Sequence, residues 1–396
     1  GLALNTVSSP VKGLIPLRYN AFGLVATVDG PRTDVSDVTT YGYDANGNLT
    51  SITNALSQVT EITARDARGY PTELEDVNDV VTELTYSSRG WLTSRTVKSS
   101  QGDAVTTFDY DAVGQVTGIT LPDGSELLYE YDAAHRLTAI QNGLGERVEY
   151  TLDAAGNRTA ENVKDTGGSI TRTMSRVYDE LSRLRDSLGA NGQSTDLDYD
   201  DNDNLTQIED GLSRITGQSF DALDRLIEIT DPALNDATYD YDDRDNLTQV
   251  TDPGGVATSY VYDGLNNLIQ ESSPDAGTTV HEYDAAGNLT ETTDGRGIVV
   301  QYSYDALNRL TGITYPASTG ENVTYTYDTG TNGVGRLRSV TDESGTTTYT
   351  YDDRGNALSV SRNTGSETFV TSYTYDLADN VTSITYPSGR TVTYSR

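Results

Sequence analysis

Acidic side chains come closest to a catalytic arrangement in this sequence. Asp198 and Asp200, like Asp240 and Asp242, lie two residues apart, so both carboxylates of a pair would lie on one face of a β-strand. Two carboxylates that face each other across a cleft serve glycoside hydrolysis as acid and base. The same Asp recurs in most segments of the chain, however, which a single active site would not require. We therefore interpret these residues as turn residues, and we expect no catalytic residue and no enzymatic activity.

A run of oxygen-bearing side chains offers a second chemistry, the binding of calcium. Residues 200–204 are Asp-Asp-Asn-Asp-Asn, and residues 242–246 are similar. A calcium-binding loop of this type needs Gly at its sixth position and a bidentate Glu at its twelfth. Counted from Asp200, those positions hold Leu205 and Gly211. We favour a solvated acidic turn with weak binding of divalent ions across the surface, and we expect no specific metal site and no cofactor.

Composition and charge exclude several classes of protein. The 396-residue chain has a net charge of −33, no Cys and two His. It therefore has no disulfide framework, no thiolate zinc site and no cysteine nucleophile. The negative charge argues against nucleic acid and anionic membranes as partners. No apolar run approaches the roughly 20 residues of a membrane-spanning helix. The chain opens with Gly1, its one Met is Met174, and no signal peptide is recognisable, so we expect a processed product or a piece of a longer chain.

One repeat recurs from one end of the chain to the other. The clearest copy, Tyr-Asp-Ala-Asn-Gly-Asn-Leu-Thr at 43–50, returns as Tyr-Asp-Ala-Ala-Gly-Asn-Leu-Thr at 283–290. Between Tyr178 and Tyr304 the spacing is 21 residues every time, and the mean period is about 22. We expect a lead-in at 1–13 and an array of about 17 repeats at 14–396 that ends within a repeat. Looser copies begin at Tyr110, Tyr131, Tyr178, Tyr199, Tyr241, Tyr262, Tyr304, Tyr327, Tyr351 and Tyr375, and degenerate copies at Tyr19, Arg65, Tyr86, Leu152 and Phe220.

The sequence pattern of each repeat predicts two β-strands and two turns. Runs such as Thr324-Tyr325-Thr326-Tyr327 alternate with period two, which places Tyr on one face of a strand and Thr on the other. The Asp after the Tyr suits a turn, because its carboxylate accepts a hydrogen bond from the backbone two residues on. Three residues after this Asp, most repeats have Gly, Asn or Asp, which tolerate a left-handed backbone. A second turn, such as 252–255, closes the repeat, so about 34 strands of seven or eight residues are expected.

The other unusual residues have structural explanations. His281 occupies a strand position and His135 a turn position, and the Gly-rich segment 330–335 lacks the Lys-Ser/Thr and the helix of a phosphate-binding loop. Trp91 is assigned to the Leu position of its repeat, where it would pack within the sheet. Asn-x-Thr sequences fall mostly at one turn position, which favours turn chemistry over glycan attachment. They begin at Asn48, Asn157, Asn204, Asn246, Asn288, Asn322 and Asn380.

So many strands cannot form a flat open sheet. Sheets of more than about ten strands curl or split, and strand twist accumulates with one hand. The aromatic residues are 27 Tyr, four Phe and one Trp, so few large, wholly apolar side chains are present to fill a solid core. We therefore predict an all-β fold in which tandem hairpins form a spiralling, curled sheet, a hollow β-shell or tube. Stacked Tyr ladders are expected to line it, and contacts between neighbouring repeats to stabilise it.

These repeats resemble the Tyr-Asp (YD) repeats of the rearrangement-hotspot (Rhs) family. That family includes bacterial polymorphic toxins, the B and C components of insecticidal toxin complexes, wall-associated bacterial proteins and teneurin adhesion receptors. The resemblance covers about residues 14–396 and implies a sheet that spirals into a hollow shell, which in the toxins encloses an unfolded or partly folded effector. The family's self-cleaving C-terminal segment has no counterpart here, so no catalytic residue is carried over. The structural repeat residues are Tyr43, Asp44, Gly47, Tyr110, Asp111, Gly114, Tyr199, Asp200, Tyr241, Asp242, Tyr262, Asp263, Tyr283, Asp284, Gly287, Tyr304, Asp305, Tyr351, Asp352, Gly355, Tyr375 and Asp376.

The resemblance and the missing catalytic constellation together imply a structural role. We expect a shell segment that encapsulates or presents a polypeptide cargo, a toxin, in a secreted or cell-surface bacterial protein, with neighbouring shell segments as its other partners. An acidic shell would tolerate a basic cargo. Two alternatives stay open. The first is an extracellular module that binds a cell-surface protein or glycan through exposed Tyr and turns. The second is a filament that forms by pairing of open sheet edges.

Overall fold

The computed structural model describes residues 15–189 and 192–395 of the chain. The predicted lead-in at 1–13 lies outside the described residues. Within these residues the protein is almost entirely β-sheet, with one 3₁₀-helix, η1 (Thr319–Glu321). The strands have three to nine residues, and most have five to seven, fewer than the seven or eight predicted.

The strands of the first half of the chain are β1 (Leu17–Tyr19), β2 (Val25–Val28), β3 (Thr39–Tyr43), β4 (Leu49–Thr53), β5 (Val59–Arg65), β6 (Pro71–Glu75), β7 (Val81–Tyr86), β8 (Leu92–Val97), β9 (Ala104–Tyr110), β10 (Val116–Thr120), β11 (Glu126–Tyr131), β12 (Leu137–Asn142), β13 (Arg147–Leu152), β14 (Arg158–Lys164), β15 (Ile170–Tyr178), β16 (Leu184–Leu188) and β17 (Ser194–Tyr199). Those of the second half are β18 (Leu205–Glu209), β19 (Ile215–Phe220), β20 (Leu226–Thr230), β21 (Asp236–Tyr241), β22 (Leu247–Thr251), β23 (Ala257–Tyr262), β24 (Leu268–Ser273), β25 (Gly277–Tyr283), β26 (Leu289–Thr293), β27 (Val299–Tyr304), β28 (Leu310–Thr314), β29 (Val323–Tyr327), β30 (Leu337–Asp342), β31 (Gly345–Tyr351), β32 (Ala357–Asn363), β33 (Thr368–Tyr375), β34 (Val381–Thr385) and β35 (Thr391–Thr393).

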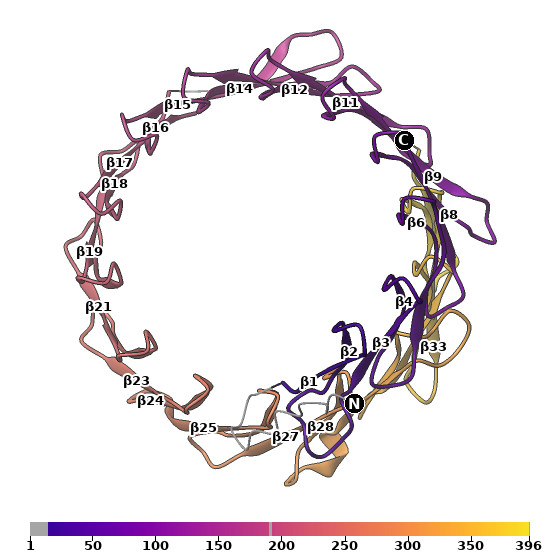
Figure 1. The fold of residues 1–396 in the computed structure, drawn as a ribbon. Coiled ribbons are helices and arrows are strands. Elements are labelled where there is room, and N and C mark those ends of the chain that lie inside the picture. The colour runs from indigo at the N-terminus through magenta and orange to yellow at the C-terminus, as the bar shows by residue number, and fades with distance from the viewer. Residues whose placement is uncertain (1–14, 190–191, 396) are drawn as a thin grey trace. The chain divides into compact units, whose positions relative to one another are not determined.

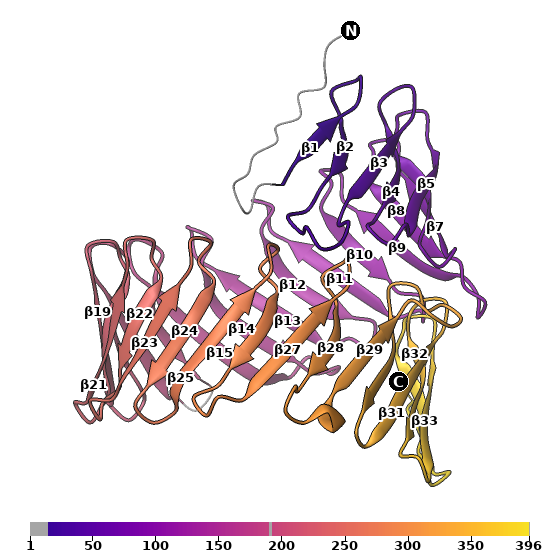
Figure 2. The same cartoon turned by 90° about the horizontal axis from the view of Figure 1, so that it is seen from below.

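All described strands belong to one antiparallel sheet of 35 strands, in which each strand pairs with the next along the chain. The strands consist largely of Tyr, Thr, Val and Ile, the residue types that favour a pleated, half-buried surface. Figure 2 shows successive hairpins, for instance from β21 to β25, lying side by side. The predicted all-β array of tandem hairpins is therefore confirmed.

The register of each hairpin is set at the turn that follows the Tyr, which we call the Tyr-Asp turn. Between β21 and β22, Tyr239 lies opposite Val250, whereas Tyr241 lies opposite Leu247 after a bulge. Asp245 in this turn has a φ of 64°. A bulge beside one left-handed residue is the three-residue hairpin connection that the sequence predicts.

The left-handed positions predicted from the sequence are confirmed throughout. Every Gly, Asn or Asp expected there, from Gly23 to Asp379, has a positive φ. His135 and Ser182, which depart from the usual residue types, have positive φ as well, at 63° and 65°. The turn geometry is thus kept even where the residue type changes.

The sheet has two chemically different faces and almost no buried interior. Tyr239 and Tyr241 project to one side, the tyrosine face, and Asp240 projects to the other, the polar face. Among the described residues the buried apolar side chains are Val80, Val97, Ala104 and Ala139, at 9%, 7%, 6% and 0% exposure. A wall one sheet thick must therefore be held together mainly by its hydrogen-bond ladder and its turns.

The chain divides into two compact units, which are described separately. Unit 1 comprises Gly1–Thr107, Leu121–Asp123 and Thr279–Arg396, and unit 2 comprises Phe108–Thr120 and Gly124–Thr278. Unit 2 is a run of consecutive hairpins (Figure 1). Unit 1 combines hairpins from both ends of the array, and Figure 2 shows its early strands, such as β9, next to its late strands, such as β32.

Side-chain contacts within unit 1 show how the two ends of the array meet. Asn78 Nδ2 donates to Val334 O at 3.0 Å, and Asn78 Oδ1 accepts from Val334 N–H at 3.0 Å, across 256 residues of sequence. Ser99 Oγ donates to an Asp353 oxygen 254 residues away. The ladder between these residues is continuous and the two sequence separations nearly equal. Within unit 1, late repeats therefore lie against early ones, which confirms the predicted curling.

Two glycines test the left-handed turn geometry. Gly255 and Gly264 both have open space where a Cβ would lie, but only Gly255 is in the left-handed region, at φ +80°. Gly255→Ala is expected to lower the urea midpoint of unfolding, because an L-residue in that region costs about 1–2 kcal/mol. Gly264→Ala is expected to leave the midpoint unchanged or raise it slightly, because Ala lowers the entropy of the unfolded chain. Equal losses in the two variants would contradict this geometry.

Candidate functional site

Most Tyr-Asp turns are organised by the carboxylate of their Asp. In the turn 242–246, Asp242 Oδ1 accepts hydrogen bonds from the N–H groups of Arg244 at 2.8 Å and Asn246 at 2.9 Å. Oδ2 accepts a third bond, at 2.9 Å, from Nδ2 of Asn246. The predicted bond from the backbone two residues after the Asp is therefore confirmed. The same three bonds form at Asp44, Asp200, Asp263, Asp284 and Asp376.

These hydrogen bonds stabilise the ionised form of the carboxylate. The side chain of Asn246 is the main cause that lowers the pKa of Asp242, and Asn204 has the same effect on the pKa of Asp200. In a second turn, the side chain of Arg214 lowers the pKa of Asp210 to about 2. The turns therefore contain aspartates that remain charged well into the acidic range.

The residue four positions after the turn Asp, which we call the clasp residue, links many of the repeats to the next. Asn246 is such a residue, and besides bonding to Asp242 it donates from Nδ2 to Asn266 Oδ1 in the following turn, at 3.1 Å. Its bond therefore joins two turns that are one repeat apart. Equivalent bonds run from Asn157 to Ser182, Asn204 to Asp224, Asn288 to Asn308 and Asn356 to Asp379.

Where the clasp residue is Arg, it makes more contacts. Arg225 Nε donates to Asp221 Oδ2 of its own turn at 2.7 Å. Its Nη1 donates to Asp242 O and Asp245 Oδ1 of the next turn, both at 2.9 Å. The guanidinium also lies 4.9 Å from the ring centre of Tyr241, a cation–π distance. Arg183 and Arg309 likewise bond to the next turn and lie over its Tyr.

The Tyr hydroxyl links many of the repeats to the preceding one. Tyr241 Oη donates to Leu226 O at 2.9 Å, and burial raises the pKa of this hydroxyl. The predicted reach of the hydroxyl to a carbonyl is therefore confirmed, and Phe could not replace Tyr in this bond. The same bond is made by Tyr43, Tyr131, Tyr199, Tyr327, Tyr351 and Tyr375, to the carbonyls of Val25, Val116, Leu184, Leu310, Leu337 and Ala357.

The predicted ladder of stacked Tyr rings is wrong. Among the described residues one pair stacks, Tyr70 on Tyr86, with ring centres 5.2 Å apart. Equivalent Tyr residues of neighbouring repeats are two strands apart, which separates them by roughly 9.6 Å. Aromatic rings interact at about 4.5–7 Å, so a second group must fill the gap. At several repeats that group is the Arg clasp residue.

The carboxylate pairs singled out in the sequence do not form facing pairs. β17 ends at Tyr199, so Asp200 lies in the turn, while Asp198 projects from the strand and accepts a bond from Gln207 at 3.2 Å. Asp240 and Asp242 are separated in the same way, because β21 ends at Tyr241. The prediction that each pair shares one strand face is therefore wrong, since the bulge and turn begin between the two residues.

The assignment of Trp91 is also wrong, by one position. Leu92 lies opposite Tyr86, as Leu247 lies opposite Tyr241, so Leu92 holds the Leu position. Trp91 instead occupies the clasp position, with the Arg89 guanidinium 5.0 Å from its ring centre.

The two histidines take part in local contacts. His135 Nδ1 lies 2.8 Å from Gln115 Oε1, and His281 Nδ1 lies 3.1 Å from Thr292 Oγ1.

The repeat residues predicted from the sequence occupy equivalent positions in their hairpins. A strand ends at the Tyr, the Asp opens the turn, and the Gly has a positive φ, as at Gly47, Gly114, Gly287 and Gly355.

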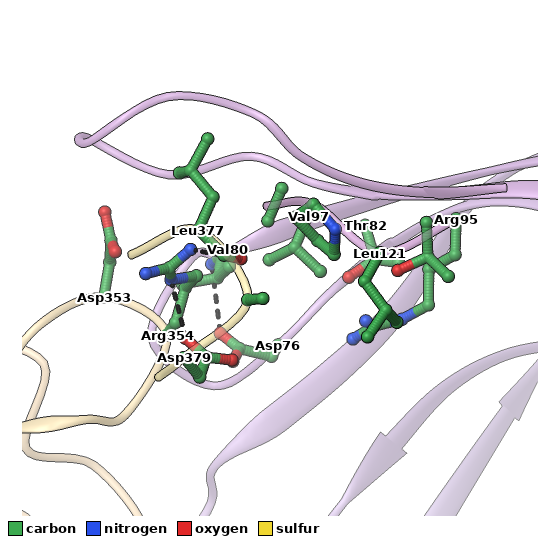
Figure 3. Close-up of a pocket in the computed structure, with 14 residues that line it drawn as sticks. Asp76, Val80, Thr82, Arg95, Val97, Leu121, Asp353, Arg354, Leu377 and Asp379 are labelled. Carbon is green, nitrogen blue, oxygen red and sulfur yellow. Dashed lines mark hydrogen bonds and ion pairs between the residues drawn. The ribbon is translucent and has the colours of Figure 1, made fainter. Parts of the chain in front are cut away.

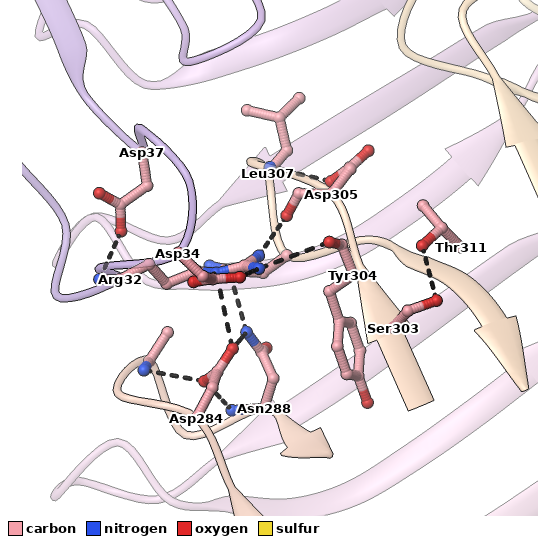
Figure 4. Close-up of polar contacts among 12 residues, drawn as sticks. Arg32, Asp34, Asp37, Asp284, Asn288, Ser303, Tyr304, Asp305, Leu307 and Thr311 are labelled. Atoms are coloured by element: carbon pink, nitrogen blue, oxygen red, sulfur yellow. Dashed lines mark hydrogen bonds and ion pairs between the residues drawn. The ribbon is translucent and has the colours of Figure 1, made fainter. Parts of the chain in front are cut away.

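Sequence reasoning missed the contacts by which the ends of the array meet in unit 1. Arg32, in the loop between β2 and β3, has a side chain that is 4% exposed and pairs with Asp34 at 2.6 Å. Its guanidinium donates to the carbonyls of Asp305 and Tyr304, and its Nε lies 3.6 Å from Asp284 (Figure 4). No periodic signal marks Arg32, because these partners in late repeats lie more than 250 residues away in the sequence.

A second meeting point in unit 1 surrounds a cavity of about 280 Å³ (Figure 3). Val80, Val97 and Ala104 form a buried cluster there, and Leu377 from a late repeat packs against it. Arg354, whose side chain is 4% exposed, lies 3.1 Å from Asp379 and donates to the carbonyls of two turn residues. Because these groups are engaged with one another, we interpret the cavity as a packing gap between repeats.

The described residues contain neither of two common functional features. No cluster of three or more His, Asp or Glu in the described part of the chain is placed to hold a metal ion. Nor do the described residues include a helix with the length and apolar character of a membrane span.

Comparison with known proteins identifies the repeat. The model of the RHS Repeat family matches segments that together cover more than half of the chain. No curated protein sequence matches it. The matched residues are 19–59, 110–147, 131–170, 199–235, 241–278, 283–319, 332–368 and 351–391.

Solved structures share the fold at low sequence identity. The crystal structure of TcdB2-TccC3-Cdc42 aligns with a TM-score of 0.57 at 14% identity, over 95% of this chain and 23% of that chain. That of TcdB2-TccC3-TEV gives 0.57 and 15%, over 94% and 25%. A mutant Tc holotoxin pore of Photorhabdus luminescens gives 0.52 and 16%, over 95% and 24%. The chain thus spans about a quarter of the length of these solved chains.

Removal of a single hydroxyl tests the bond between repeats. Tyr241→Phe is expected to lower the free energy of unfolding by about 1 kcal/mol, the net contribution of one hydrogen bond. Phe220 occupies the same repeat position without a hydroxyl, so Phe220→Tyr is expected to raise the urea midpoint. Tyr386→Phe is the control, because Tyr386 is 42% exposed and should change little. An equal loss in Tyr241→Phe and Tyr386→Phe would contradict the role of the bond.

Low pH is expected to destabilise the folded sheet, because the turn aspartates become protonated. A carboxyl whose pKa is lower in the folded than in the unfolded chain stabilises the fold above its unfolded pKa, about 4. That contribution is lost as the pH falls through the folded pKa, which is about 2 at Asp210 and Asp342. The urea midpoint, followed by circular dichroism, should fall as the pH drops below about 4. A loss confined to about pH 5–7 would contradict this assignment.

Proposed function

The chain belongs to the RHS repeat family, and on that premise we propose that it forms a segment of the wall of a shell that encapsulates or presents a polypeptide cargo, such as a toxin. The family match and the fold shared with the TcdB2-TccC3 structures support the structural part of this proposal. The segment would belong to a secreted or cell-surface bacterial protein and have no enzymatic activity of its own.

The main support for a structural role comes from the polar side chains of the repeat, which bond within the repeat and to its neighbours. The Asp242 carboxylate closes its own turn, Asn246 binds the following turn, and the Tyr241 hydroxyl binds the preceding repeat. Groups that could do chemistry are thus already bonded to neighbouring repeats. This is the expected pattern for a wall whose stability comes from nearest-neighbour contacts.

The charge of the wall favours a basic cargo. Acidic residues lie directly opposite one another across strands, as at Glu61 and Glu75, and at Asp186 and Asp196. Like charges in such positions destabilise a sheet. A basic polypeptide beside the polar face would reduce this repulsion, and the net charge of −33 would attract it.

Adhesion through exposed Tyr has less support. Tyr residues at strand ends, such as Tyr199 and Tyr241, are half-buried, and their hydroxyls bond to carbonyls. The described Tyr residues with more than 40% exposure are Tyr19, Tyr70, Tyr386 and Tyr394, which form no series along the array.

Protection of a fused reporter tests encapsulation. An unfolded basic peptide with several Phe sites would be fused to the C-terminus of the chain and digested with chymotrypsin. An acidic peptide of equal length with the same Phe sites is the control. The basic reporter is expected to survive several-fold longer on the chain than when it is free, and the acidic reporter is not. Equal cleavage rates for the free and the fused basic reporter would refute the proposal.

A further inference from the structure

The exposure of the Tyr-Asp turn tips differs along the chain. We define the tip as the second residue after the turn Asp. In the late repeats of unit 1, which meet the early repeats, the tips are not exposed, and at Arg354 the side chain is 4% exposed. The other tips there are Ala286, Leu307 and Ala378. In unit 2 the apolar tips are 59%, 69%, 67% and 43% exposed, at Val113, Leu181, Leu223 and Leu265.

The surface that covers the tips in unit 1 is the opposite edge of the sheet, which is formed by the second turns. Asn78, in the second turn 76–80, bonds to Val334, and Val80 in the same turn is 9% exposed. The second turns of unit 2 are open by comparison. Their apolar residues Leu144, Leu212 and Leu234 are 76%, 75% and 81% exposed.

We propose that the Tyr-Asp turn edge of unit 2 is an assembly surface for the second-turn edge of a second copy of this chain. One copy carries both edges, and within unit 1 a second-turn edge packs against a Tyr-Asp turn edge. The contact would be heterologous, so it could continue from copy to copy. It joins turn edges and leaves the strand edges unpaired, which distinguishes it from a filament formed by strand pairing.

The identity of the tip residues supports this proposal. Single exposed apolar residues are ordinary on a protein surface. Leu181, Leu223 and Leu265, however, occupy the same turn position in every second repeat and therefore form a row along one edge.

Charge sets the conditions under which the copies would associate. Each copy has a net charge of −33, so two copies repel each other over long distances. Salt screens this repulsion, because the Debye length falls from about 10 Å at 0.1 M to 3 Å at 1 M. An apolar contact is not weakened by the same salt, and sulfate strengthens it. Association should therefore increase with salt, the reverse of what an interface of ion pairs would show.

Sedimentation velocity on the intact chain tests the proposal. The average mass is expected to rise with protein concentration, and to rise further when salt is increased from about 0.05 M to 0.5 M. The variant L181S/L223S/L265S, which leaves the charge unchanged, should associate at least tenfold more weakly. L128S/V177S/V261S is the matched control, because it removes apolar residues that are 42%, 38% and 44% exposed on strands of unit 2. A monomer under all conditions, or association that the tip variant leaves intact, would overturn the proposal.

Crosslinking tests the pairing of the two edges. The chain has no Cys, so single Cys variants can be linked specifically with a short bismaleimide. Leu223→Cys places the thiol on the Tyr-Asp turn edge, and Leu234→Cys places it on the second-turn edge. Linked dimers are expected in the mixture of the two variants and not with either variant alone. Links within Leu223→Cys alone, or no links in the mixture at concentrations where the chain associates, would refute this pairing.

Discussion

The aspartate that follows each Tyr is the side chain on which the rest of the wall depends. With few buried apolar residues, among them Val80 and Ala139, the sheet has no interior to hold its repeats in place. Asp242 shows the alternative, because one carboxylate binds two backbone N–H groups and the clasp residue Asn246. The turn then fixes the bulge and the register of its hairpin. The Tyr hydroxyl and the clasp residue extend that order to the repeats on either side.

Two clasp chemistries serve the same geometry. Asn reaches the next turn with one amide, whereas Arg225 reaches a carbonyl, a carboxylate and the face of a Tyr ring. The Arg therefore fills the gap of two strands that separates equivalent rings. This use of Arg also bears on the acidity of the chain. The turns account for many Asp residues, and several of the few Arg residues lie beside them. Few basic residues therefore remain to offset the acidic residues of the polar face.

Local features of the fold were predictable from the sequence, and contacts between distant repeats were not. The Tyr-Asp-x-x-Gly spacing predicted the hairpins and the left-handed residues, because both depend on fewer than ten neighbouring residues. Trp91 was assigned to the wrong position because the clasp position and the Leu position are adjacent in the sequence. The predicted ladders of stacked rings do not form because equivalent Tyr residues are two strands apart, which is too far for their rings to stack. Arg32 could not be foreseen, since its partners in late repeats lie more than 250 residues away in the sequence.

The central claim is that contacts between neighbouring repeats stabilise the wall. Hydrogen exchange measured along the whole chain tests it most directly, with Arg225→Ala compared with the unchanged protein. We predict faster exchange in the hairpins of residues 215–251, on either side of the lost clasp, and unchanged protection in repeats farther away. Loss of protection along the entire chain would contradict the claim, because it would show that the wall unfolds as one unit. Unchanged exchange beside residue 225 would contradict it as well.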